Sequence, residues 1–258
     1  MSDYQPGRQQ WKDWLNRSVS FIMYSSVFIS LCAVALCIET NLLLQGPVLH
    51  PAFYVFVFCA TLLQYNLHYY PRKKDPGPSA REQWSHRNRK LHFTLIVISI
   101  AGIVFSLFYF RINHFLIVAL LGLITFVYSF PVLPIGGGKR LKDSGIAKLL
   151  TITLIWTIIT VWFPADEAHL NNPHFWLLFI RRFLFMLVLC LAFDIRDILP
   201  DYQEGIRTLP ILIGKKNSYR IIYSVLALFV IISLYQFHLN HQLLHLNAMI
   251  LSAGATFA

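Results

Sequence analysis

Three aspartates, Asp194, Asp197 and Asp201, stand close together near the end of a long apolar stretch. Their spacing places side chains on one face of an α-helix, so the three carboxylates are expected to lie together. Carboxylates in such a row repel one another unless a cation lies among them. Hard oxygen ligands of this kind suit Mg²⁺ shared with a phosphate-bearing substrate. The alternative is salt bridging to the nearby Arg196 and Arg207 and to lysines of the loops.

Two apolar stretches turn polar before they end, and each then meets a proline. The first is apolar over 52–63 and polar up to Pro71, and the second is apolar over 183–193 and carries the aspartates before Pro200. Each is too short to cross a bilayer unless its polar end still lies at membrane depth. Polar groups at that depth normally face a cavity. The sequence therefore predicts a polar pocket between helices.

The overall composition points to a membrane protein. Of 258 residues, 56% are hydrophobic and 13% are charged, whereas soluble domains are about 25% charged. So little charge does not cover a water-facing surface, the apolar content excludes disorder, and no hydrophilic domain is left to bind nucleic acid. We expect an all-α polytopic membrane bundle, one domain over residues 1–258, with about eight transmembrane helices around a cytoplasm-facing cavity. The candidate spans are residues 20–38, 52–70, 91–110, 115–130, 146–163, 175–197, 221–239 and 243–258.

The basic residues are concentrated on one side of this bundle. Lys and Arg number 22 against 12 Asp and Glu, a net charge of +10, and most of the basic residues fall in residues 1–18 or after the second, fourth and sixth spans. The positive-inside rule makes this side cytoplasmic. We therefore expect a multi-pass protein of the plasma or inner membrane with a cytoplasmic N-terminal arm. Arg181 and Arg182 lie inside the sixth span, and we expect them to snorkel to the interface.

The aspartate segment reads DxxDxxxDxxxGxxTLP from Asp194 to Pro210, which resembles the second aspartate-rich motif of the UbiA superfamily of membrane prenyltransferases. The resemblance implies Mg²⁺-assisted ionisation of a polyprenyl diphosphate, followed by alkylation of an aromatic or other lipophilic acceptor. It makes Asp194, Asp197 and Asp201 the expected metal-binding and catalytic residues. In that family, paired aspartate-rich motifs follow the second and sixth helices, where the polar helix ends fall here.

A second segment, Tyr128-Ser-Phe-Pro-Val-Leu-Pro134 followed by Lys139 and Arg140, is similar to a tyrosine-and-basic segment of the family. The resemblance places Tyr128 and these basic residues beside the reacting diphosphate. Basic side chains at a pocket mouth would offset the charge of a leaving diphosphate. The basic residues stand several positions later than in the family pattern.

The first aspartate-rich motif departs from the family pattern, which is roughly NxxxDxxxD. Asn66 is in place as a candidate catalytic residue, but Tyr70 and Lys74 stand at the two acidic positions. One interpretation is that Arg72, Lys73 and Lys74 replace the charge of one metal ion at the diphosphate, although a lysine does not supply Lewis-acid polarisation. Others are a different substrate or a loss of prenyl transfer.

The leading functional hypothesis is a membrane transferase that moves a prenyl group from its diphosphate to a lipophilic acceptor. The alternative is a catalytically degenerate relative that binds lipid or isoprenoid without turnover. A transporter is disfavoured because no inverted repeat with broken helices is evident. The family usually has nine helices, and this sequence accommodates eight, so we expect a chain without the ninth helix.

Overall fold

Helices make up nearly all regular structure in the described part of the chain. The computed structural model describes residues 6–46, 49–71, 80–129, 144–165, 167–203, 205–240, 249–250 and 252–254. Within these residues the one extended pairing is an isolated parallel bridge between Ser144 and Arg207. The predicted all-α class is confirmed. The chain divides into two compact units, unit 1 (residues 1–39 and 47–111) and unit 2 (residues 40–46 and 112–258).

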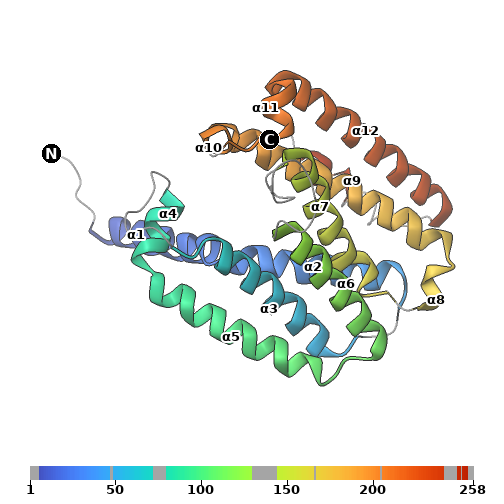
Figure 1. Ribbon diagram of the computed structural model, residues 1–258, viewed down its shortest axis with the longest axis horizontal. Coiled ribbons are helices and arrows are strands. Elements are labelled where there is room, and N and C mark those ends of the chain that lie inside the picture. Colours follow the sequence, from blue (N-terminus) through green and yellow to red (C-terminus); the bar gives the residue numbers. More distant parts are fainter. Residues whose placement is uncertain are drawn as a thin grey trace. The chain divides into compact units, whose positions relative to one another are not determined.

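Unit 1 is organised around two long helices that pack along each other, α3 (Pro51–His68) and α5 (Arg89–Leu107) (Figure 1). Gly102 allows this close packing, since a Cβ atom there would lie 2.4 Å from the Cys59 sulfur. The other helices are α1 (Pro6–Tyr24), α4 (Ala80–Arg87) and α2 (Val27–Leu43), whose last residues belong to unit 2.

The predicted span over 20–38 is not one continuous helix. α1 and α2 meet at a break over Ser25 and Ser26 with a bend of 60°, and Ser26 has a left-handed φ of 68°. Such a break frees backbone groups, which need new partners in an apolar environment. Asn66 Nδ2 donates to the Ser25 carbonyl at 3.0 Å, and Arg81 Nη2 donates to Ser26 Oγ at 3.1 Å. Side chains of α3 and α4 thus stabilise the break.

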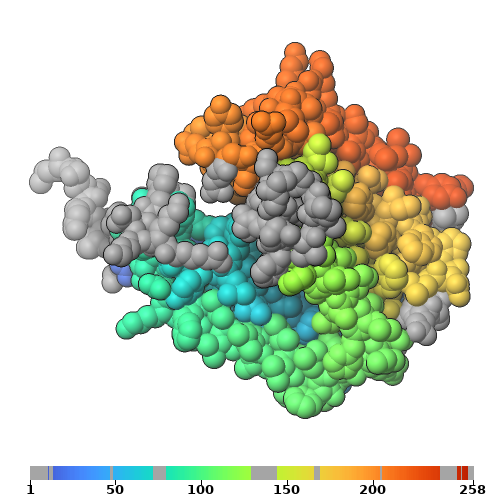
Figure 2. Space-filling view, in the orientation of Figure 1, coloured from blue at the N-terminus to red at the C-terminus, as the bar shows by residue number. Residues whose placement is uncertain are grey.

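Unit 2 is built around α9 (Pro173–Arg196), which packs against α7 (Gly145–Thr157) and α12 (Lys215–Asn240) (Figure 1). Apolar side chains from all three helices form its core, among them Leu149, Val188, Leu191, Ile222 and Leu226. α7 continues as the π-helix η2 (Ile158–Trp162), and α6 (Ile112–Ser129) and α8 (Glu167–Leu170) complete the unit together with two short helices. These are α10 (Ile198–Gln203) and α11 (Leu209–Ile213), coloured orange in Figure 2.

Several described helices are long and apolar enough to cross a membrane. They are Arg89–Leu107, Gly145–Trp162, Pro173–Arg196 and Lys215–His238, with a fifth span if the bent pair Trp14–Tyr24 and Val27–Leu43 counts as one. α3 is absent from this set because its last turns are polar. The polytopic character is confirmed. The number eight stays a prediction, and residues 243–258 lie mostly outside the described residues.

The expectation that Arg181 and Arg182 snorkel to the membrane interface is wrong. Their side chains are 2% and 4% exposed, because both face the interior of unit 2. Arg181 Nη1 donates to Gln236 Oε1, and Arg182 Nη2 lies 3.5 Å from Thr40 Oγ1. The Thr40 hydroxyl donates in turn to the Thr160 carbonyl at 2.6 Å. Both cations thus bond to side chains inside unit 2, although Arg182 Nη1 has no hydrogen-bond partner among the described residues.

Candidate active site at the end of α9

The aspartate segment is divided between two helices. α9 begins at Pro173, where Asn172 caps the helix by accepting a hydrogen bond from the His174 amide at 2.9 Å. It ends at Arg196, because the ring of Pro200 conflicts with a continued helix at the residue four positions earlier. Asp197 caps the end with a φ of −96° and a ψ of 17°, and α10 follows. The acids therefore do not share one continuous helix.

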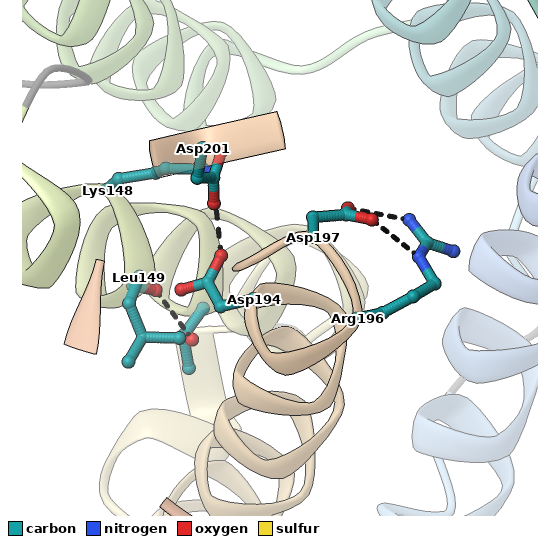
Figure 3. A network of polar contacts seen from close by, with 7 residues as sticks. Lys148, Leu149, Asp194, Arg196, Asp197 and Asp201 are labelled. Carbon is teal, nitrogen blue, oxygen red and sulfur yellow. Dashed lines mark hydrogen bonds and ion pairs between the residues drawn. The ribbon is translucent and has the colours of Figure 1, made fainter. Parts of the chain in front are cut away.

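Two of the three aspartates meet at a single lysine. Lys148 Nζ lies 3.4 Å from Asp194 Oδ1 and 3.5 Å from each carboxylate oxygen of Asp201 (Figure 3). Asp194 and Asp201 are 6% and 7% exposed, so these charges are largely removed from solvent. The ammonium and the two carboxylates form a buried charge cluster, which we call the Lys148 cluster. Pairing of this kind is required for buried charges, whose desolvation is costly.

Asp197 takes no part in this cluster. Its carboxylate turns to Arg196, whose Nε and Nη2 donate to it at 2.7 and 2.8 Å (Figure 3). Both side chains are considerably exposed, at 62% for Arg196 and 39% for Asp197. The expected single face of three carboxylates is thus wrong, because the helix break at Asp197 redirects this side chain. Salt bridging, the alternative interpretation of the segment, is present at all three acids, because Asp197 pairs with Arg196 while Asp194 and Asp201 pair with Lys148.

Lys148 is held in place by a close approach of the backbone. It lies in the first turn of α7, one turn after Gly145. A Cβ atom on Gly145 would come within 2.1 Å of the Arg207 carbonyl oxygen and 2.2 Å of the Thr208 Cα. The bridge between Ser144 and Arg207 lies at the same place. The start of α7 is therefore packed directly against the Gly205–Leu209 part of the aspartate motif, which fixes the lysine beside the acids.

At the end of α3, by contrast, Asn66 is the centre of a neutral network. It is fully buried, and its Nδ2 group donates to the Ser25 and Leu62 carbonyls at 3.0 and 2.8 Å. Its Oδ1 accepts from His92 Nδ1 at 2.6 Å, since an amide oxygen only accepts. This leaves His92 Nε2 to accept from the Ser85 hydroxyl at 3.2 Å.

Tyr70, which stands at the first acidic position of the family's first motif, binds an arginine. Arg89 Nε donates to the Tyr70 hydroxyl at 3.1 Å, and the guanidinium lies 5.3 Å from the ring centre. An open hollow of about 920 Å³ in unit 1 is lined by Tyr70, Arg87, Asn88, Arg89, Lys90, Leu91, Phe93 and Thr94. The charges at this hollow are basic, so it offers positive charge rather than ligands for a metal ion.

One protein family matches the part of the chain that contains the Lys148 cluster. A model described as the UbiA prenyltransferase family matches residues 87–258. The chain belongs to the UbiA prenyltransferase family. The match includes the whole Lys148 cluster and begins after Asn66 and Tyr70, so the conforming motif lies within it and the divergent one outside. No curated protein matches the chain significantly. Family membership and the apolar helices make this a multi-pass integral membrane protein.

Prenyltransferases of the UbiA family generally use Mg²⁺ with the diphosphate substrate, and the acids of this chain fit such an ion. Asp194 Oδ2 is buried and has no hydrogen-bond partner among the described residues. A buried carboxylate oxygen without a partner is costly and is a suitable ligand for a hard cation. Within the described residues, no three His, Cys, Asp or Glu side chains come together as a metal site, and Asp197 pairs with Arg196 instead of joining Asp194 and Asp201.

The remaining predicted site residues of this UbiA-family chain are only partly placed. Tyr128 lies in the last turn of α6 and is half-buried. The predicted diphosphate-binding residues lie outside the described residues, and their role stays a prediction: Arg72, Lys73, Lys74, Lys139 and Arg140. Sequence reasoning missed Lys148 and His92 as site residues. A lysine in the first turn of an otherwise apolar span was the available signal for Lys148, since such charges are rare and functional.

Proposed function

We propose that this chain transfers a prenyl group, within the membrane, from a polyprenyl diphosphate to an aromatic or other lipophilic acceptor. Family membership supports a membrane prenyltransferase. The observation that carries the proposal is the Lys148 cluster, which places two buried carboxylates and one cation at the end of an apolar helix. Burying such a cluster is costly, and charged residues inside membrane-spanning segments generally mark functional sites.

The residues of this chain would act as follows. Asp194 and Asp201 would hold Mg²⁺, which supplies positive charge to a leaving diphosphate. Lys148, which lies beside both acids, would offset further negative charge of the diphosphate. In the reaction, the carbon–oxygen bond to the diphosphate breaks, the diphosphate leaves with the electron pair, and a nucleophilic carbon or oxygen of the acceptor bonds to the prenyl carbon and loses a proton. Burial of the carboxylates keeps water from this charge cluster.

The predicted basic residues are also part of the proposal. Arg72, Lys73, Lys74, Lys139 and Arg140 would bind the diphosphate, and Tyr128 would contact the donor, as their resemblance to the family pattern implies. The N-terminus and these basic segments would face the cytoplasm, in agreement with the positive-inside rule. A water-soluble diphosphate head would then meet the protein from that side while its prenyl chain stays in the bilayer.

The test is release of inorganic diphosphate by the purified protein in lipid nanodiscs. Polyprenyl diphosphates of increasing chain length are supplied with Mg²⁺ and a panel of aromatic acceptors, and a parallel reaction contains a chelator. We expect chelator-sensitive diphosphate release coupled to a prenylated product for at least one donor. Asp194→Asn should abolish release while Asp197→Asn retains it. Failure to bind any polyprenyl diphosphate would contradict the proposal.

One observation favours the second candidate, a lipid-binding relative without turnover. Tyr70 stands where the family has an acid, and it is bound by Arg89. If this role is correct, the protein binds a polyprenyl diphosphate with measurable affinity, and no acceptor leads to release of diphosphate. The same nanodisc assay therefore separates the two candidates.

A further inference from the structure

Lys148 occupies the place between two acids that a metal ion would occupy. Its Nζ atom lies 3.4 Å from Asp194 and 3.5 Å from Asp201, and the side chain is only 21% exposed. The two carboxylates come from different helices, α9 and α10. Without a cation between them they would repel each other in a poorly solvated place. The chain thus supplies its own counter-ion at this site.

The Lys148 cluster contains two carboxylates and one ammonium. Asp194 Oδ2 is buried without a hydrogen-bond partner among the described residues. This oxygen is the open ligand of the site. A divalent cation that reached it would lie within a few ångströms of the Lys148 ammonium and be repelled by it. The lysine and a divalent cation therefore compete for the same carboxylates.

We propose that Lys148 is an internal counter-ion that keeps Asp194 and Asp201 paired and weakens their binding of a divalent cation when no diphosphate is present. This inference rests on the proposed function, because it concerns the same site. A diphosphate brings several negative charges, to which the Lys148 ammonium can turn, and the carboxylates are then released for the metal ion. Metal and diphosphate consequently enter together, and a metal ion alone binds poorly.

The position of Lys148 favours this role over a purely structural salt bridge. The start of α7 is already fixed to the aspartate motif through Gly145, whose Cα faces the backbone of Arg207 and Thr208, and through the bridge from Ser144. These segments are therefore held together by backbone contacts in addition to the lysine. Its contacts of 3.4 to 3.5 Å are also longer than a tight charged hydrogen bond, as suits a group that exchanges partners.

The experiment measures binding of Mn²⁺ alone, as a paramagnetic substitute for Mg²⁺, to the full-length protein in detergent. Lys148→Met removes the charge at similar length, and we expect it to tighten Mn²⁺ binding by at least about tenfold, since one repulsive charge is lost. Lys148→Arg retains the charge and should bind Mn²⁺ as the unmodified protein does. Lys216→Met, which removes an exposed cation from the start of α12, is the matched control and should have no effect.

Asp194→Asn added to Lys148→Met should remove the gain and so locate it at this site. Equal or weaker Mn²⁺ binding by Lys148→Met, or no binding by either protein, overturns the inference.

If Lys148→Met does not fold, chemical labelling of the unmodified protein tests the same inference. Saturating Mn²⁺ should raise acetylation of Lys148 relative to that of Lys216, and unchanged labelling overturns the inference. Neither measurement uses a prenyl donor, so a protein without prenyl transfer would contradict the proposed function and leave this result standing.

Discussion

The ends of α3 and α9 look alike in sequence and differ in chemistry. Each is an apolar helix that turns polar shortly before a proline. At the end of α3, both Nδ2 hydrogens and the Oδ1 atom of Asn66 are used in hydrogen bonds within unit 1. At the end of α9, Asp194 keeps a buried oxygen that has no such partner among the residues that the structure describes. One helix end is closed by neutral hydrogen bonds, and the other holds a buried cluster of charged side chains.

This difference shows which polar residues serve the fold and which are available to a ligand. A buried amide with every hydrogen-bonding position filled stabilises its surroundings and has little left to offer a substrate. A buried carboxylate with an open oxygen is destabilising by itself, so its presence at the end of α9 calls for a cation or substrate. Predictions that separate stability from activity can therefore confirm or refute the comparison.

The largest effect is expected at Asp194. Asp194→Asn removes a charged ligand from the Lys148 cluster, and we expect diphosphate release to fall by about 100-fold or more, as for other lost electrostatic groups of an active site. Asp197→Asn should have a much smaller effect, because Asp197 is exposed and bonded to Arg196. Initial rates with saturating donor measure both. Equal losses in the two variants would show that the structural separation of these acids has no functional meaning.

A loss of stability is expected at Asn66. Asn66→Ala leaves His92 Nδ1 and the Ser25 carbonyl without their partner, and we expect the free energy of unfolding to fall by about 2 kcal/mol. Denaturant unfolding in detergent, followed by circular dichroism, measures this change. The exposed Gln64 lies two residues earlier on the same helix, and Gln64→Ala is the matched control. If Asn66→Ala kept full stability and lost diphosphate release, Asn66 would act on the substrate and the comparison would be wrong.

The contact between α7 and the aspartate motif can be tested at Gly145. Gly145→Ala forces a methyl group against the Arg207 carbonyl and the Thr208 Cα, and we expect a loss of about 1 to 2 kcal/mol from overpacking. Gly122, in α6, has nothing within 4 Å of an added Cβ, so Gly122→Ala should keep or raise stability by helix propensity. Unfolding curves of the two variants give the difference. Similar stability in both would show that the start of α7 has room to move.

The sequence predicted the class of fold and the family, because hydropathy and a spaced motif are local properties, and the roles of the three aspartates stay predictions. It did not predict that Asp197 leaves the cluster, since that depends on the helix break before Pro200. The pairing of Lys148 with two acids depends on the contact of Gly145 with Arg207 and Thr208, which lie far away in the chain. The burial of Arg181 likewise depends on Gln236 of another helix. The local periodicity of a sequence does not predict long-range contacts of this kind.

The smallest effect is expected at Arg196, and it tests whether the charges around α9 act as one group. The ion pair with Asp197 is bidentate but exposed, and exposed pairs contribute less than about 1 kcal/mol to stability. Arg196→Met should therefore change the unfolding free energy little and leave diphosphate release unchanged, as measured in the same detergent and nanodisc assays. A large loss of activity at full stability would mean that Arg196 and Asp197 belong to the active site, and that the functional part of this helix end is wider than the Lys148 cluster.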